Sequence, residues 1–294
     1  MAVVGANGEP SDDWQQDLAG RLAESVFPLL ASLVPKVDLE KVTQALAPGL
    51  EALAAAAEAA AASFVGQIEP PVLSPGLLAA LERVREQLPV NWPAGIEIED
   101  VTAVIQDDGI PLVWVPPAAV VDEVLDAPDR GARVSVLLSH TDELLRDCRR
   151  VLADVNADRL QRQLPLAPRA LDAIEQGHHE AAQALAVVVT DATIAGWIIG
   201  KFEKLEKQVH FDPEETPFDE WRLKAAVAPL RNFKQRYFAG QGTRPTGLNR
   251  QVTVHYAEAD HFTKGNALIA CLLMTSVLRA FQDFEENTAD RPQA

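Results

Sequence analysis

The feature that most constrains the fold is a twenty-residue apolar run, AAQALAVVVTDATIAGWIIG, at positions 181–200. A helix that is apolar on all sides must be covered all round, either by lipid or by other helices. Asp191 stands near the middle of the run, where a carboxylate would be costly in lipid. No loop shows the basic bias expected beside a membrane-spanning helix. We therefore expect a buried helix in a bundle, in a cytoplasmic protein without membrane contact.

The remainder of the chain is also mainly helical in pattern, and the predicted fold class is mainly α. The strand signal is confined to IEIEDVTAVIQDDGIPLVWVP at 96–116, where two apolar runs flank Asp-Asp-Gly. This pattern predicts a β-hairpin with strands near 101–106 and 110–115. From residue 117 onward we expect a short helix over 118–126, a long one over 135–164, another over 168–206, and two or three more before residue 284. A boundary near 128–134 would separate an N-terminal helical region with the hairpin (1–134) from a C-terminal helical bundle (135–294).

Several kinds of site are not indicated. The sequence has no GxSxG elbow, no GxxxxGK phosphate loop and no complete GxGxxG. His178 and His179 are followed by Glu-Ala-Ala-Gln, so the second histidine of an HExxH zinc motif is missing. A surface or helix-start role is therefore favoured over metal binding. The two cysteines, Cys148 and Cys271, are far apart and without a CxxC motif. We therefore expect no metal and no cofactor.

The charge distribution is more informative. Formal net charge is −17, yet the 29 residues from 222 to 250 contain seven basic and no acidic residues. Phosphate contacts and base stacking by this stretch would suit RNA. The alternative is a solvated face that balances the acidic remainder of the same chain. The predicted RNA-binding residues are Arg231, Lys234, Arg236, Tyr237, Arg244 and Asn249.

Arg250 closes this stretch, and His255 follows five residues later. A histidine can take or give a proton near neutrality, and a guanidinium can stabilise charge developing on a phosphate. On a regular α-helix, five residues leave the two side chains ~140° apart, so they do not share a face. A complete site would then need a second copy of the segment, which predicts a homodimer.

The run from Asn249 to His255, with TKGNAL at 263–268 and an apolar last helix, resembles the end of HEPN-domain proteins (higher eukaryotes and prokaryotes nucleotide-binding). Their signature is R-x4-6-H near the start of the final helices of a compact bundle. Many members are metal-independent endoribonucleases of toxin–antitoxin, phage-abortive and other defence systems, and most are dimers. The resemblance implies that Arg250 and His255 are the catalytic pair and that Gln251 positions the histidine. It also implies RNA as substrate and an antitoxin or regulatory partner.

Two other functions stay open from the sequence. The same bundle would serve as a non-catalytic dimerisation or interaction module if Arg250 and His255 had structural roles alone. A DNA-binding regulator is less favoured, because no helix-turn-helix pattern stands out.

Overall fold

The computed structural model describes residues 88–93, 95–197, 207–240 and 242–289. This part of the chain is 67% helical and contains no strand, so the mainly helical fold class is confirmed. The helices predicted before residue 88 lie outside the described residues.

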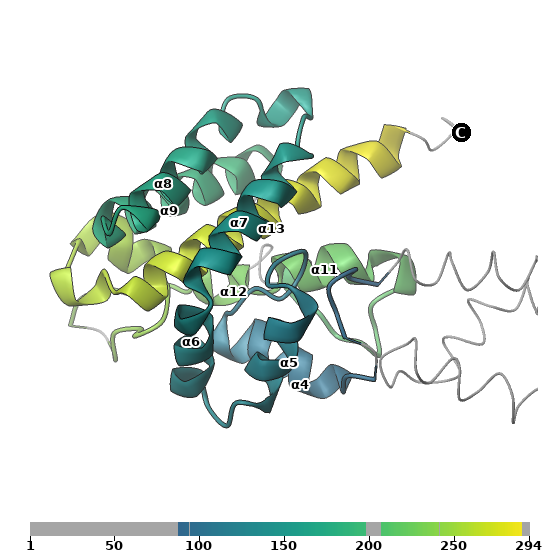
Figure 1. Ribbon diagram of the computed structural model, residues 1–294, viewed down its shortest axis with the longest axis horizontal. Coiled ribbons are helices and arrows are strands. Elements are labelled where there is room, and N and C mark those ends of the chain that lie inside the picture. Colours follow the sequence, from purple (N-terminus) through teal and green to yellow (C-terminus); the bar gives the residue numbers. More distant parts are fainter. Residues whose placement is uncertain (1–87, 94, 198–206, 241, 290–294) are drawn as a thin grey trace, which may run out of the picture.

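The described helices are joined by short turns at 127–129 and 176–178 and by longer irregular segments, such as 109–117 (Figure 1). The α-helices are α4 Ile98–Thr102, α5 Ala118–Asp126, α6 Arg130–Ser139, α7 Thr141–Ala153, α8 Ala167–Glu175, α9 His179–Trp197, α11 Trp221–Val227, α12 Leu230–Phe233 and α13 Lys264–Ala289. Two segments are π-helical, η1 Ala103–Asp108 and η5 Val252–Tyr256. Short 3-10 turns are η2 Asp158–Leu160, η3 Leu164–Leu166, η4 Phe218–Glu220 and η6 Ala259–His261.

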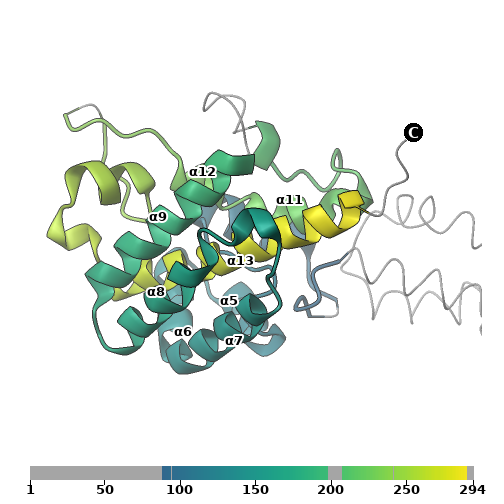
Figure 2. The same ribbon diagram turned by 90° about the horizontal axis from the view of Figure 1, so that it is seen from above.

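The last helix, α13, forms the centre of the core. It contacts α6, α7, α8, α9 and α11, and it crosses the molecule between the helices drawn above and below it (Figures 1 and 2). Its stretch from 264 to 286 is long and apolar enough to cross a membrane, but 83% of the apolar window is buried by the other helices. That burial is what a core helix of a globular bundle requires.

The apolar run at 181–200 falls on α9 as far as it is described. Its residues Ala182, Ala186, Val187 and Ile194 belong to the hydrophobic core, and α9 packs along both α13 and α8. Packing covers one side of this helix, but Val188 is 51% exposed, and Ala192 and Ala195 are exposed as well. The expectation of a buried helix is therefore met in part for the described residues. Asp191 lies on its partly exposed side, with a side chain that is 24% exposed.

The predicted β-hairpin is wrong. Residues 98–108 are helical, and Gly109 ends the π-helix in the left-handed conformation, at φ 67°. A glycine with positive φ serves equally well in a hairpin turn and after a helix, so the Asp-Asp-Gly signal was ambiguous. The side-chain amide of Asn232 donates to the carbonyls of Gln106 and Asp107, which satisfies the end of this helix.

The second predicted strand is an irregular segment buried in the core. Ile110, Leu112, Val113 and Val115 have no exposed surface. Side chains replace the ladder that a strand would have used: Asn91 donates to the carbonyls of Leu112 and Pro116, and its own oxygen accepts from the Trp114 amide. Buried backbone groups must be paired, and here they are paired by side chains from elsewhere in the chain.

The helices after residue 117 follow the prediction in part. The short helix at 118–126 is confirmed as α5. The long helix expected over 135–164 is instead α6 and α7, which meet at His140, followed by two 3-10 turns. Core residues on both sides of position 134 belong to one hydrophobic cluster, from Leu88 to Phe281. The division at 134 stays a prediction, because most of the proposed N-terminal region lies outside the described residues.

Candidate functional site

Arg250 and His255 meet within one chain. Nη1 of Arg250 lies 2.9 Å from Nε2 of His255. The segment carrying the histidine is a π turn, closed by a bond from the Ala257 amide to the Val252 carbonyl at 3.0 Å. A π turn contains more residues than an α turn, so residues five apart come close to one face. The ~140° separation expected for a regular α-helix is therefore wrong here.

Asp191 of α9 anchors the arginine. Its Oδ2 accepts from Nε of Arg250 at 3.1 Å and lies 3.1 Å from Nη2. Its Oδ1 contacts the ammonium of Lys234. One carboxylate therefore connects two cations that are sixteen positions apart in the sequence. Arg250 retains the Nη1 edge for His255 and for solvent, and its side chain is 28% exposed.

Hydrogen bonds from the buried residues Asn249 and Gln183 fix the start of the segment that contains Arg250 and His255. Asn249 has no exposed surface, and its side-chain oxygen accepts from the Val252 amide at 3.0 Å, which is the bond of a helix N-cap. Its amide nitrogen donates to the carbonyls of Asn232 and Gln235. Gln183 of α9 donates to the hydroxyl of Thr253 at 3.1 Å. These contacts fix the π turn against α9 and the segment after α12.

Tyr256, the residue after the histidine, packs against Tyr237. The Tyr256 hydroxyl accepts from the Ala239 amide at 3.0 Å, and its ring meets that of Tyr237 edge-on, with centroids 5.3 Å apart. Tyr237 is buried, whereas the neighbouring Phe238 is 50% exposed. Of the aromatic residues in the basic stretch, Phe238 is therefore the one open to a base, because Phe233 is also buried.

The predicted RNA-binding residues have different placements. Arg231 and Arg236 are exposed, and Lys234 lies half-buried against Asp191. Asn249 is a buried cap, so its amide is occupied by the protein. Gln251 is half-buried beside Arg250 and begins the π turn; within the described part, no hydrogen bond to its side chain supports a positioning role.

Arg244 is fully engaged by two acidic residues. It pairs with Asp260 through two bonds, at 2.8 and 2.6 Å, and also contacts Glu258. The hydrogen bonds that it donates to Asp260 and Glu258 raise the pKa of the Arg244 guanidinium above its usual range. The same arginine lowers the pKa of Asp260. The contact fastens the loop before Arg250 to the segment after His255.

The basic stretch is largely neutralised by acids from elsewhere in the chain. Four of its cations form ion pairs: Arg222 with Asp283, Lys234 and Arg250 with Asp191, and Arg244 with Glu258 and Asp260. Neutralisation by acidic residues of the same chain was the alternative to phosphate binding. For these four cations, the structure contains such ion pairs. A phosphate at the site would compete with Asp191.

The sequence interpretation missed Asp191 as a site residue. Its signal was present, since an aspartate in an apolar helix requires a partner, but the sequence did not say which cation lies opposite. Among the described residues, no group of three or more histidines, cysteines or carboxylates is arranged to hold a metal ion. Comparisons with protein-family models, with curated proteins and with solved structures found no match to this chain.

Proposed function

We propose that the protein is a metal-independent endoribonuclease of HEPN type, in which Arg250 and His255 of one chain cleave RNA with help from the 2′-hydroxyl. The observation that carries the proposal is the 2.9 Å contact between Arg250 Nη1 and the exposed His255. A permanent cation beside an imidazole is a pair suited to phosphodiester chemistry. The resemblance to HEPN-domain proteins at 249–268 suggests the same reaction.

The contact assigns the tautomer of the histidine. A guanidinium has donors only, so His255 Nε2 must accept, and its proton is then on Nδ1. Nε2 is the atom that would take a proton from substrate, and Arg250 covers it. A phosphate that attracts Nη1 of Arg250 would uncover this lone pair, so binding of the phosphate would prepare the base.

The reaction can be followed atom by atom. His255 Nε2 removes the proton from the ribose 2′-hydroxyl, and the 2′-oxygen attacks the adjacent phosphorus. The bond from phosphorus to the 5′-oxygen breaks, and the departing oxygen takes a proton from water. The hydroxide so formed takes the proton held by His255 Nε2, which returns the imidazole to its neutral form. Arg250 stabilises the negative charge on the non-bridging oxygens. The products are a 2′,3′-cyclic phosphate and a 5′-hydroxyl end.

The decisive experiment compares wild type, His255→Ala and His178→Ala on total RNA in the presence of EDTA. His178 is an exposed histidine immediately before α9, so it controls for loss of a surface imidazole. His255→Ala should lower the cleavage rate by about 10²- to 10⁴-fold while RNA affinity stays close to wild type. Cleaved ends should carry 2′,3′-cyclic phosphate.

Two outcomes would sink the catalytic assignment. One is wild-type cleavage by His255→Ala, and the other is loss of activity on chelation. The His178→Ala variant should cut like the wild type. If it also loses activity, the effect of the His255 change is not specific.

The second candidate is a non-catalytic interaction module. It is favoured by the ion pairs of Arg222, Lys234, Arg244 and Arg250, which leave these cations engaged within the chain. A purified wild-type protein that binds RNA no better than an acidic control protein of equal charge, and cuts none, would support this candidate.

A further inference from the structure

A cavity of about 420 Å³ lies on α9 away from the Arg250–His255 pair. One wall is the turn that contains Asp158, Arg159, Leu160, Arg162 and Gln163. The other wall is the end of α9, with Ala192, Thr193 and Gly196. A Cβ atom at Gly196 would meet nothing within 4 Å, so the space in front of this helix is open.

The turn that carries Arg159 and Arg162 is attached to helix α13 and to the core. The side-chain oxygen of Gln282, a buried residue of α13, accepts from the amides of Asn156 and Ala157 at 2.9 and 2.7 Å. Leu160 is 1% exposed and anchors the turn in the core. The cavity wall is therefore built on paired backbone groups, which is the preorganisation that a binding site needs.

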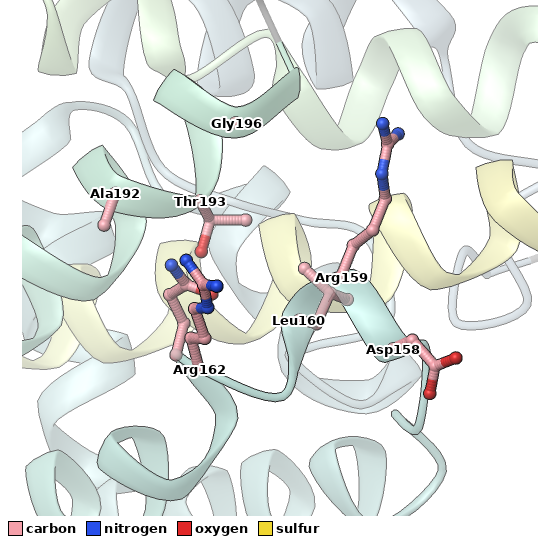
Figure 3. Close-up of a pocket in the computed structure, with 8 residues that line it drawn as sticks. Asp158, Arg159, Leu160, Arg162, Ala192, Thr193 and Gly196 are labelled. Atoms are coloured by element: carbon pink, nitrogen blue, oxygen red, sulfur yellow. The ribbon is translucent and has the colours of Figure 1, made fainter.

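The charged groups of the cavity are two guanidinium groups and one carboxylate. Arg162 extends toward Thr193, and Asp158 points away from the opening (Figure 3). Arg159 lies on the other side of the opening, where it pairs with Glu285 at 3.3 Å while 67% of its side chain stays exposed. Among the described residues, no carboxylate pairs with Arg162. Arg162 is exposed, so its guanidinium is open to a ligand in the cavity.

We propose that this cavity binds a small phosphate-bearing molecule, with Arg162 and Arg159 contacting the phosphate and the uncharged body resting on Leu160, Ala192 and Gly196. Guanidinium groups bind phosphate through paired hydrogen bonds, which favours this anion over a halide. The cavity volume of about 420 Å³ falls within the ~300–1,000 Å³ typical of small-molecule sites, so the cavity has room for more than a phosphate ion. The proposal does not depend on ribonuclease activity.

The test uses phenyl phosphate, with phenol and with sodium chloride of equal ionic strength as comparisons. For wild type, about 10 mM phenyl phosphate should raise Tm by about 3–6 °C if that concentration is ten times the Kd. Phenol and sodium chloride should give no comparable shift. Titration calorimetry should show one site per chain.

The variants locate the ligand. Arg162→Gln should weaken binding by at least about tenfold, since it removes a charge-assisted contact. Arg169→Gln, a change at an exposed arginine of α8 that does not line the cavity, and Arg250→Gln at the proposed active site should both leave binding unchanged. Gly196→Leu fills the cavity but keeps both arginines, so it should weaken phenyl phosphate more than inorganic phosphate.

Absence of any shift in wild type overturns the proposal, as does undiminished binding by Arg162→Gln. Loss of binding in Arg250→Gln would move the ligand to the other site and would equally overturn it.

Discussion

At the scale of single residues, Asp191 connects helix α9 to Arg250 and Lys234 through one carboxylate. Its contact with Nε of Arg250 orients the guanidinium so that Nη1 faces His255. The same negative charge reduces the attraction of the site for phosphate. A positioning role and a cost in substrate affinity are therefore combined in one side chain.

Replacing Asp191 by Asn should separate these two effects. We expect kcat to fall by about 10- to 100-fold, because Arg250 would no longer be held in place. RNA affinity should rise, and its salt dependence should steepen by about one counterion, because Lys234 becomes available to a phosphate. Single-turnover cleavage and RNA binding at two salt concentrations measure both effects.

Asp142→Asn, at an exposed position on α7, changes the net charge equally and should alter neither quantity. If Asp191→Asn binds RNA more weakly than wild type, or cleaves it at an undiminished rate, the positioning role is refuted.

Two other histidines should give opposite dependences of stability on pH. Burial lowers the pKa of His261 below 6.5, so the unfolded chain binds its proton first as pH falls. Its contribution to stability is present above about pH 6.5 and is lost as pH decreases through the folded-state pKa. In urea unfolding, the free energy of unfolding should fall less steeply below about pH 6.5 for His261→Gln than for wild type.

His140 behaves in the reverse way, because hydrogen bonds to Glu123, and then to Glu143, raise its pKa above 6.5. These partners, 3.0 and 3.2 Å away, join the α6–α7 junction to α5. The stabilisation is complete below about pH 6.5 and is lost as pH rises through the folded-state pKa. The difference between wild type and His140→Gln in urea midpoint should close as pH rises; a difference that widens would contradict this assignment.

At the scale of elements, the buried segment 109–116 depends on side chains for its backbone pairing. Asn91→Ala would orphan the Trp114 amide and the Pro116 carbonyl, since Leu112 also accepts from Trp92. Trp114 has a positive φ of 62°, which Asn91 helps to hold. We expect a loss of about 2–4 kcal/mol in the free energy of unfolding.

Ser276→Ala is the matched control, because it removes one bond, from its hydroxyl to the Val113 carbonyl at 2.7 Å. It should cost about 1–2 kcal/mol. Equal losses in the two variants, measured by urea unfolding, would show that the network around Asn91 is not the main support of this segment.

The same segment shows which parts of the fold the sequence could predict. Apolar spacing correctly predicted helix α5 and the burial of one side of α9, because an apolar helical face must be covered wherever it lies. It failed at 98–116, where Gly109 suited both a hairpin and a helix end, and where the distant Asn91 and Ser276 supply the partners. It also failed at 250–255, because a π turn has no sequence signal comparable to helical periodicity. The sequence singled out Arg250 and His255 as a candidate pair, but it predicted neither their contact within one chain nor the ion pair of Arg250 with Asp191.

At the scale of the whole molecule, the contact between Arg250 and His255 removes the original reason to expect a dimer. The homodimer stays a prediction, but a single chain already brings the pair together. We expect that adding excess His255→Ala chains to wild type, at saturating RNA, leaves the cleavage rate per wild-type chain unchanged. A rate that falls in proportion to mixed dimers would instead show a site shared between chains.

The central position of α13 has a consequence for biosynthesis. Helices α6, α7, α8, α9 and α11 all precede α13 in the chain, yet all of them pack against it. These helices also pack on one another, but during translation the apolar faces that contact α13 stay uncovered until residues 264–289 follow. Domains generally fold as units, and exposed apolar surface in incomplete chains promotes aggregation. A nascent chain halted before residue 264 should therefore remain a substrate for chaperones, and its core should close only when the last helix leaves the ribosome.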